Sequence, residues 1–454
     1  MDLDADLAAL DGYPVLCAYN ANVDAIRRVD SDLERLLAPP TDAPEGRLDA
    51  RAELAAAIAG TMRRGSGDER AMTDDFAAEL EATFDADEQR LGGQAGIMAD
   101  VLSVVDAAPV LYTYLLSERQ RTQFSRPDRI RFPVDAGDGL DLRPLREAPL
   151  AAKTKLNWIF EFDAGDTFFD ATAADASRFI AASRPDEFDL HTPVDSHSRA
   201  LGERVGCAVL SGFHSVKPAY DDGRTFEVCL DNAASFVRGV GESARVQVEL
   251  GVTHDREIRR AVRERIVPEA DVVSLDGHEL NQLRDDLALP EPESDAAIVR
   301  RYETLSRLLD ALSVAALSFH AKDYFLAAFD DAYLPPTAVR RGFDFAACVA
   351  AAKAEDGLVT GPDDLGDATA YPPAEAGERA VETLADHLGV SDESAVEGTI
   401  GNAVETEGVV AVPNRVVDRP ASTVGIGDAV SVTSFALANA VADADEVTAR
   451  RENQ

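Results

Sequence analysis

The order of apolar runs and helical patterns along the chain limits its possible folds more than any other feature. Short apolar runs such as "CAVL" (207–210), "RVQVEL" (245–250) and "DVVSL" (271–275) are typical of buried strands. Longer segments with helical periodicity lie between such runs or follow them; they include 94–107, 224–237, 254–266, 298–312 and 426–442. Because strands that alternate with helices usually pair in parallel, the chain from about residue 205 onward predicts a parallel sheet with helices on both faces.

Two segments interrupt this pattern. Residues 25–90 and 155–200 are polar, acidic and broken by proline, as in "LLAPPTDAPEG" and "RPDEFDLHTPVDSH". Since 454 residues are many for one core, they predict a second, smaller, β-rich lid domain over the carboxyl edge of the sheet. We expect "VTGPDDLGDATAYPPAEAG" to be a long loop of the large domain. The expected division is a large α/β domain from 1–20, 93–154 and 200–454, and a lid from 21–92 and 155–199.

Composition argues against several classes of partner. The net charge is −39, and the only lysines are Lys153, Lys155, Lys217, Lys322 and Lys353. Nucleic acids and anionic membranes need clustered cations, so we expect neither as a partner. We interpret the acidic, lysine-poor surface as an adaptation to a salt-rich cytoplasm, where salt screens self-repulsion. Scattered cysteines, an acidic N-terminus and no long apolar run predict a cytoplasmic protein without zinc sites, disulfides or membrane spans.

One glycine-rich stretch carries the clearest chemical signal. Gly425, Ile426, Gly427 and Asp428 lie where an apolar strand is expected to become an apolar helix. Backbone N–H groups at a helix start point at negative charge, and glycines let a ligand approach closely. A carboxylate there can take a proton from an attacking group. A second Gly-x-Gly-Asp at 65–68 has no apolar strand before it, and the motif alone does not decide between the two.

Polar residues also follow other predicted strands. Asn20, Asn22 and Asp24 end the strand "PVLCAY", and Gly93 and Gln94 begin a helix rich in small residues. These groups could hydrogen-bond sugar hydroxyls at the carboxyl edge of the sheet, or they could form an Asx-rich turn and a tight helix contact. For the similar "LSGFHS", residues 210–215, a structural turn is the simpler interpretation.

Carboxylates and cations at strand ends leave further alternatives open. Glu249, Asp276 and Glu279 could hold Mg²⁺ through water, and the ion would then bridge phosphates. Alternatively, Asp276 is a helix N-cap and Glu279 a first-turn acid. Arg178 could neutralise a phosphate or form a surface ion pair. His320 could stack on a base or satisfy a turn.

Taken together, these stretches resemble the ADP-dependent glucokinase and phosphofructokinase family of the ribokinase-like superfamily, with the acidic composition of a halophilic archaeal-type member. The resemblance covers nearly the whole chain and rests on "AYNANVDAI", "RLGGQAGIMA", "NWIFEF", "SRFIAAS", "LSGF", "VQVEL", "SLDGHEL", "SFHAKDYF", "GPDD", "VVAVPNRVV" and "STVGIGDAVS". It implies transfer of the β-phosphoryl of ADP to glucose or fructose 6-phosphate, with Mg²⁺ as cofactor and AMP as product. A monomer or small homo-oligomer is expected.

The resemblance also implies a role for each matching residue. Asp428 would be the base, Gly425, Ile426 and Gly427 the anion hole, and Arg178 a contact to the nucleotide phosphates. The implied sugar contacts are Asn20, Asn22, Asp24, Glu69, Gly93 and Gln94. The implied metal ligands are Glu249, Glu279 and Asp428, and the implied nucleotide contacts are Arg178, His320, Val412, Pro413 and Gly427.

The chain departs from the family pattern at several positions. Gln247 replaces a histidine beside Glu249, Asn414 replaces a threonine, and Asp163 stands where a lysine is frequent. Glu69 lies roughly where glucose-using members carry a glutamate; its charge would repel a phosphate, which favours an unphosphorylated hexose.

These departures leave two alternatives to an ADP-dependent kinase: a non-catalytic sugar- or nucleotide-binding homologue, and an ATP-dependent kinase on the same fold. A nicotinamide enzyme is disfavoured, because no G-x-G-x-x-G follows an N-terminal strand.

Overall fold

A large mixed sheet dominates the structure, a computed structural model that describes residues 1–41, 46–185, 187, 192–251, 253, 255–330, 333–390 and 403–452, with side chains as far as 446. The strands of this sheet are β1 (Pro14–Tyr19), β5 (Ala108–Thr113), β6 (Arg131–Asp135), β7 (Leu140–Pro144), β12 (Cys207–Leu210), β13 (Arg245–Glu249), β14 (Val272–Leu275), β15 (Ala316–His320), β16 (Tyr324–Phe329), β17 (Val404–Glu405) and β18 (Val409–Pro413). Their spatial order is β17-β18-β16-β15-β14-β13-β12-β1-β5-β6-β7.

The middle of the sheet is parallel and its margins are antiparallel. Strands β6, β5, β1, β12, β13, β14 and β15 pair in parallel, whereas β7, β16, β18 and β17 pair with their neighbours in antiparallel fashion. The predicted α/β fold is therefore confirmed, with a sheet that is mixed at both margins. The carboxyl ends of the parallel strands meet along one edge, where open α/β sheets bind ligands.

Helices cover both faces of the large sheet. Val15 and Cys17 of β1 belong to one apolar cluster and Leu16 and Ala18 to another, because successive side chains of a strand point to opposite faces. The first cluster includes α1 (Leu3–Leu10), α5 (Gln94–Val104), α12 (Pro336–Asp356), α13 (Pro362–Ala368) and α15 (Ile426–Glu452). The second includes α7 (Ser198–Gly202), α8 (Phe226–Gly241) and α9 (Arg256–Arg265). A further cluster under β14 to β18 includes α10 (Gly277–Asp286), α11 (Ala297–Ala311) and α14 (Glu375–Leu388).

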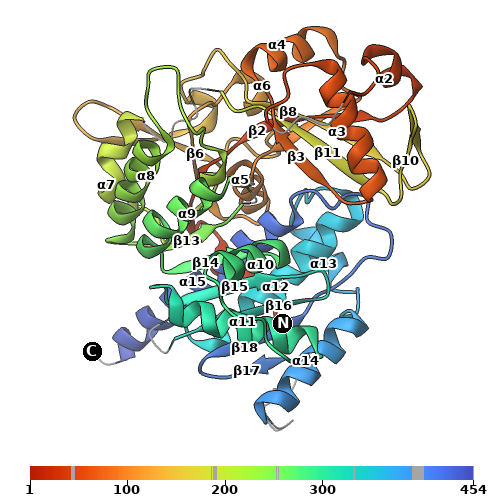
Figure 1. Cartoon of the computed structure of the whole chain (residues 1–454). Coiled ribbons are helices and arrows are strands. Elements are labelled where there is room, and N and C mark those ends of the chain that lie inside the picture. Colours follow the sequence, from red (N-terminus) through yellow and green to blue (C-terminus); the bar gives the residue numbers. More distant parts are fainter. Residues whose placement is uncertain are drawn as a thin grey trace.

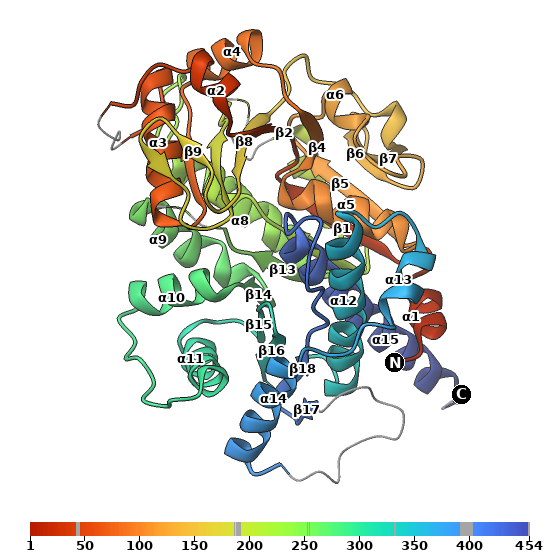
Figure 2. The same ribbon diagram turned by 90° about the vertical axis from the view of Figure 1, so that its right-hand side faces the viewer.

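A second sheet lies beside the first and has its own core (Figures 1 and 2). Its strands, in spatial order, are β3 (Asp68–Ala71), β11 (Ser177–Ala182), β8 (Leu156–Phe162), β2 (Asn22–Arg28) and β4 (Glu88–Gly92). Nearby elements are α2 (Ser31–Leu36), α3 (Arg51–Arg64), α4 (Asp74–Thr83), and a hairpin of β9 (Thr167–Phe168) and β10 (Ala171–Thr172). The buried side chains of Leu54, Ile58, Trp158 and Phe179 form much of this core. The exact division into two domains stays a prediction.

Some predicted elements were wrong in detail. The expected loop at 359–377 contains α13, which begins at Pro362 with fixed backbone and with Asp364 accepting a hydrogen bond from the Thr360 N–H at 2.7 Å. Helix α15 extends ten residues beyond the predicted 442. Residues 65–68 follow α3, and Gly65 ends that helix in a left-handed conformation (φ 65°). Predictions at 42–45, 186, 188–191 and 254 lie outside the described residues.

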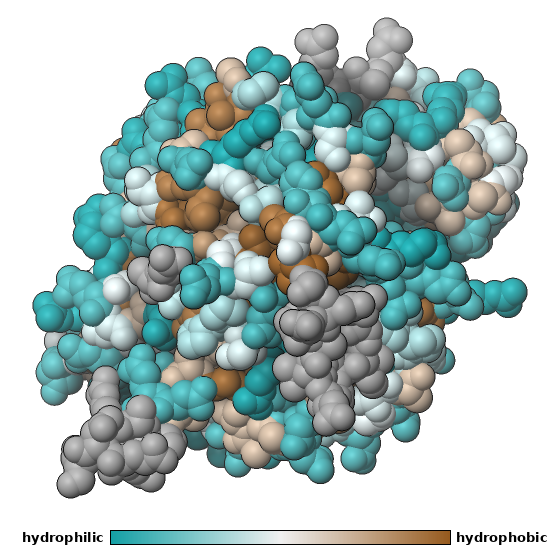
Figure 3. All heavy atoms as spheres, turned by 90° about the horizontal axis from the view of Figure 1, so that it is seen from below, coloured by the Kyte–Doolittle hydropathy of each residue, from teal (hydrophilic) through white to brown (hydrophobic). Residues whose placement is uncertain are grey.

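The surface agrees with the polar composition. The face seen from below in Figure 3 is mostly hydrophilic, and its apolar side chains form small patches. Within the described part of the chain, every helix is too short or too polar to cross a bilayer.

Candidate active site

A cleft of about 610 Å³ lies between the two sheets, at the carboxyl ends of β1 and β12. Its lining comes from both sheets and from the start of α15. Many residues singled out in the sequence share this cleft: Asn20, Asn22, Asp24, Glu69, Gly93, Gln94, Arg178, Glu279, Gly425 and Asp428. Residues more than 400 positions apart in the chain therefore meet in one cavity.

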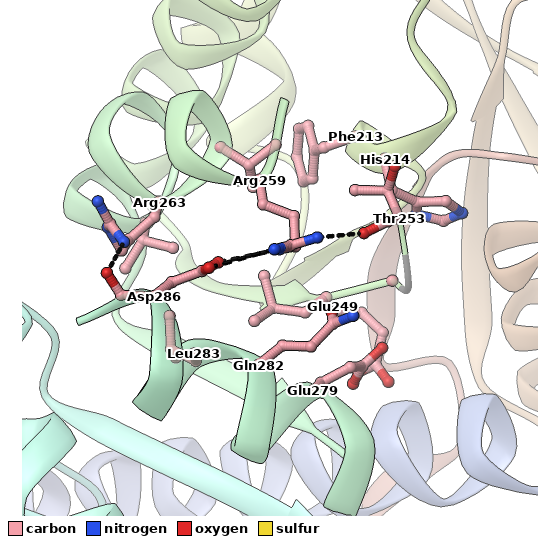
Figure 4. A pocket seen from close by; sticks show the side chains of 14 residues that line it. Phe213, His214, Glu249, Thr253, Arg259, Arg263, Glu279, Gln282, Leu283 and Asp286 are labelled. Carbon is pink, nitrogen blue, oxygen red and sulfur yellow. Dashed lines mark hydrogen bonds and ion pairs between the residues drawn. The ribbon is translucent and has the colours of Figure 1, made fainter. Parts of the chain in front are cut away.

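Other predicted residues do not line the cleft. Glu249 lines a smaller hollow that shares Glu279 with the cleft (Figure 4). A Cβ added to Gly427 would lie 2.9 Å from His320 Nε2, so the imidazole rests against the start of α15. His320 is in register with Phe325 of β16, which is in register with Val412 of β18. Pro413 is the next residue of β18.

The turn before α15 requires glycine. Gly425 has a φ of +67°, which strains any other L residue, and a Cβ there would come within 2.7 Å of Ile97 Cδ1. Its carbonyl accepts the Ala429 N–H at 3.1 Å and so belongs to the first helical turn. The first N–H groups of a helix lack partners within the helix, which makes this start suited to an anion.

Asp428 lies in that first turn of α15 and faces the cleft. Burial raises the pKa of its carboxyl to about 6, the charge of Lys353 opposes this rise, and Asp24 adds to it. A carboxylate with a pKa close to the working pH is well placed to accept a proton from a hydroxyl.

Polar groups around Asp24 form a compact pocket floor. Asn22 Nδ2 donates to Asp24 Oδ1 at 2.6 Å, and a Cβ on Gly92 would lie 2.3 Å from the same carboxylate. Gln94 Nε2 donates to the Leu250 carbonyl at 3.2 Å. Among the described residues, Asn22 Oδ1 and Gln94 Oε1 are buried and accept no hydrogen bond from the protein. Two such acceptors beside a carboxylate suit a ligand with several hydroxyl groups.

The carboxylates near the helix start are tied into hydrogen bonds. Asp276 caps α10, since its Oδ1 accepts the Glu279 N–H at 2.9 Å while Glu279 Oε2 accepts the Asp276 N–H at 2.9 Å. The capping alternative for this pair therefore matches the geometry. Glu249 accepts a hydrogen bond from Ser431 Oγ, which in turn accepts one from Gln247 Nε2 at 2.8 Å. Gln247 thus supports Glu249 through a neutral contact.

The same carboxylates repel one another. Burial raises the pKa of Glu249 to about 8, with Asp428 and Asp276 adding to the rise, and burial with Asp276 likewise raises the pKa of Glu279. Among the described residues, no trio of histidine, cysteine or acidic side chains converges closely enough to hold an ion directly. Mg²⁺ prefers oxygen ligands and keeps several waters, which fits such a loosely spaced acidic set.

Comparison with known proteins assigns the chain to a family. The model described as "ADP-specific Phosphofructokinase/Glucokinase conserved region" matches residues 13–437. The chain belongs to this family of ADP-dependent sugar kinases. It is 28% identical to the ADP-specific phosphofructokinase of Thermococcus zilligii, over 94% of this chain and 95% of that protein. It is 26% identical to the ADP-dependent glucose/glucosamine kinase of Pyrococcus furiosus, over 93% of both.

A solved structure supports the same assignment. An ADP-dependent kinase in complex with fructose 6-phosphate and ADPβS superposes with a TM-score of 0.83 and 27% identity, covering 97% of this chain and 96% of that chain. The resemblance inferred from the sequence motifs is therefore confirmed at the level of family and fold.

Two cations at the cleft of this kinase were not singled out from the sequence: one lines the cleft, and the other is buried next to the lining residue Asn20. Lys155 is 3% exposed and donates to Asn20 Oδ1, while Arg184 lies 3.7 Å from Glu69 Oε1. Burial lowers the pKa of Lys155 to about 8, against the opposing charges of Glu69 and Asp24, and burial also lowers the pKa of Arg184. The scarcity of lysine was the one signal that could have drawn attention to Lys155, since most lysines are exposed.

Proposed function

We propose that this kinase transfers the β-phosphoryl group of ADP to a hydroxyl of fructose 6-phosphate and releases AMP. The observation that carries the choice of acceptor is a pair of largely desolvated cations that both interact with Glu69: Arg184, which lines the cleft, and the buried Lys155, which donates to the lining residue Asn20. Two desolvated cations close together favour a dianionic group, because phosphate replaces the water that they have lost. The phosphofructokinase of T. zilligii and the complex with fructose 6-phosphate agree with this choice.

Positive charges near Glu69 offset its carboxylate. Alone, its carboxylate would disfavour a sugar phosphate, as the sequence suggested. Arg184 Nη2 lies 3.7 Å from Glu69 Oε1, and the charge of Glu69 also interacts with that of Lys155. The carboxylate therefore contributes to a mixed site in which the positive charges offset it.

The proposed chemistry uses three parts of the cleft. Asn22, Asp24 and Gln94 hold the hydroxyls of the sugar, with the free oxygens of Asn22 and Gln94 as acceptors. Asp428 accepts the proton of the attacking hydroxyl. The N–H groups at the start of α15, together with Arg178, stabilise the negative charge of the phosphoryl group as it moves, which is the main catalytic demand of phosphoryl transfer.

Glu249, Glu279 and Asp428 would hold Mg²⁺ through water, as their oxygen donors and their mutual repulsion suggest. When bound, the ion supplies charge neutralisation for the phosphates. The protein residues themselves orient the acceptor and keep Asp428 next to the attacking hydroxyl. On the adenine side, His320, Val412 and Pro413 stay proposed contacts.

Initial rates with Arg184→Ala test the choice of acceptor. We expect KM for fructose 6-phosphate to rise about tenfold or more, because a charge-assisted contact is lost, while KM for ADP changes little. Arg63→Ala is the matched control; it removes an arginine of α3 that pairs with Asp170 at 2.7 Å and does not line the cleft. An unchanged KM for fructose 6-phosphate in Arg184→Ala, or a wild type that uses glucose alone, would contradict the proposal.

A further inference from the structure

His214 is held at the edge of the cleft by its surroundings. It belongs to a short 3-10 turn, Phe213–Ser215, directly after β12 and Gly212. Gly212 has a φ of +90°, and a Cβ there would lie 2.7 Å from Asn20 Cβ, so the turn is pressed against the end of β1. The neighbouring Phe213 packs edge-on against Tyr19, with ring centroids 5.5 Å apart. The backbone around His214 therefore has little freedom.

The imidazole itself packs closely against the backbone of Gly251. A Cβ added to Gly251 would lie 2.0 Å from His214 Nδ1 and 2.3 Å from Cε1. Nδ1 is buried on this side, and no described residue gives it a hydrogen bond. Since a buried N–H without an acceptor is costly, the proton belongs on Nε2, at the opposite edge of the ring. His214 lines the cleft, so Nε2–H is a donor available to a ligand.

The electrostatic environment keeps this ring neutral. Burial lowers the pKa of His214 to about 3, and the positive charges of Arg184 and Lys155 lower it further in the same direction. The ring thus lies within the field of both cations proposed to hold the phosphate, and it lines the same cleft as Arg184. Figure 4 shows it beside Thr253, at the border between the cleft and the smaller hollow.

We propose that His214 is an acceptor-binding residue whose neutral imidazole donates a hydrogen bond from Nε2 to a phosphate oxygen of the sugar phosphate. This inference rests on the proposed function and adds a third contact beside Lys155 and Arg184. A purely structural turn does not need an imidazole here, because Nδ1 makes no hydrogen bond within the described residues. A neutral donor also suits a site that already holds two cations, since it adds a contact without adding charge.

Steady-state kinetics of His214→Phe test this role. The phenylalanine ring keeps the packing against Gly251 and loses the donor. We expect KM for fructose 6-phosphate to rise about 10- to 100-fold, the range of a hydrogen bond to a charged group. KM for ADP, kcat and the melting temperature should change little. His214→Gln should recover part of the affinity, because its amide N–H reaches towards the position of Nε2.

The outcomes separate this inference from the proposed function. An unchanged KM for fructose 6-phosphate in His214→Phe, with an active wild type, overturns the role of His214 and leaves the proposed function standing. Equal increases in KM for ADP and for fructose 6-phosphate, or no recovery in His214→Gln, also overturn it. If His214→Phe does not fold, His214→Gln and His214→Ala are compared instead. The measured quantity is again the increase in KM for fructose 6-phosphate relative to the increase in KM for ADP. A wild type inactive with fructose 6-phosphate overturns both proposals.

Discussion

The glycine turn before α15 offers a prediction whose size follows from the structure. Gly425→Ala adds one methyl group at a position with a φ of +67°. That methyl would lie 2.7 Å from Ile97 Cδ1 and 3.0 Å from Ile97 Cγ2, whereas carbon atoms in contact are about 3.5–4.0 Å apart. Ile97 is 7% exposed, so the turn or the isoleucine must move by roughly 0.5–1 Å to restore normal contact.

Two separate losses are expected from this change. An L side chain in the left-handed region costs about 1–2 kcal/mol, which lowers the free energy of unfolding. A shift of about 1 Å at the helix start moves the N–H groups away from the phosphoryl group, and misplacement of that size can cost roughly 100-fold in rate. We therefore expect kcat to fall about 10- to 100-fold, with the melting temperature lowered by a few degrees.

Thermal unfolding and initial rates together separate these two losses. Gly137→Ala is the control, because Gly137 has a φ of +84° and nothing within 4 Å of an added Cβ. It should lose comparable stability and keep its kcat. Adding Ile97→Val to Gly425→Ala removes the nearest methyl group and should restore part of the rate. A Gly425→Ala variant with wild-type kcat would refute the reasoning that this turn positions the transferred phosphoryl group.

Three further outcomes are expected. Asp428→Asn should lower kcat at least 100-fold while equilibrium dialysis still shows ADP binding; retained turnover would remove Asp428 as the base. Ser431→Ala should lower the free energy of unfolding in urea by about 1–3 kcal/mol, since Glu249 loses its buried donor. Ser434→Ala should cost less, because among the described residues the Ser434 hydroxyl donates to the backbone carbonyls of Val430 and Ser431 alone. Because Lys155 is a cation below about pH 8 and loses its proton above it, kcat/KM for fructose 6-phosphate should fall as pH rises from 8 to 9.5, and a flat profile would argue against its role.

The sequence predicted the elements that have strong local signals. Strands such as β12 and β13 are short apolar runs, and their pattern alone indicated a parallel sheet. The start of α15 was predicted at Ile426 because glycines and an acid precede an apolar segment. By contrast, α13 was hidden within a stretch rich in proline and glycine, where Pro362 starts a helix although proline usually ends one.

Contacts between distant residues escaped prediction for a different reason. Arg184 and Glu69 are far apart in the chain, and each taken alone is an ordinary charged residue of an acidic protein. Their pairing arises because β3 and β11 are neighbours in the second sheet, with Ile180 in register with Glu69. The role proposed for His214 could not be read from local sequence either, since Gly251, which packs against its ring, follows another strand. Charge and burial at these positions depend on the folded arrangement, and no local pattern encodes them.

The most direct test of the account is the initial rate of phosphoryl transfer, with fructose 6-phosphate and glucose crossed against ADP and ATP. The assay should contain Mg²⁺ and molar KCl, which screens the net charge of −39. We expect rapid turnover with ADP and fructose 6-phosphate, formation of AMP, and a much lower kcat/KM with glucose or with ATP. Turnover with ATP and none with ADP would contradict this expectation, as would ligand binding without turnover in all four combinations.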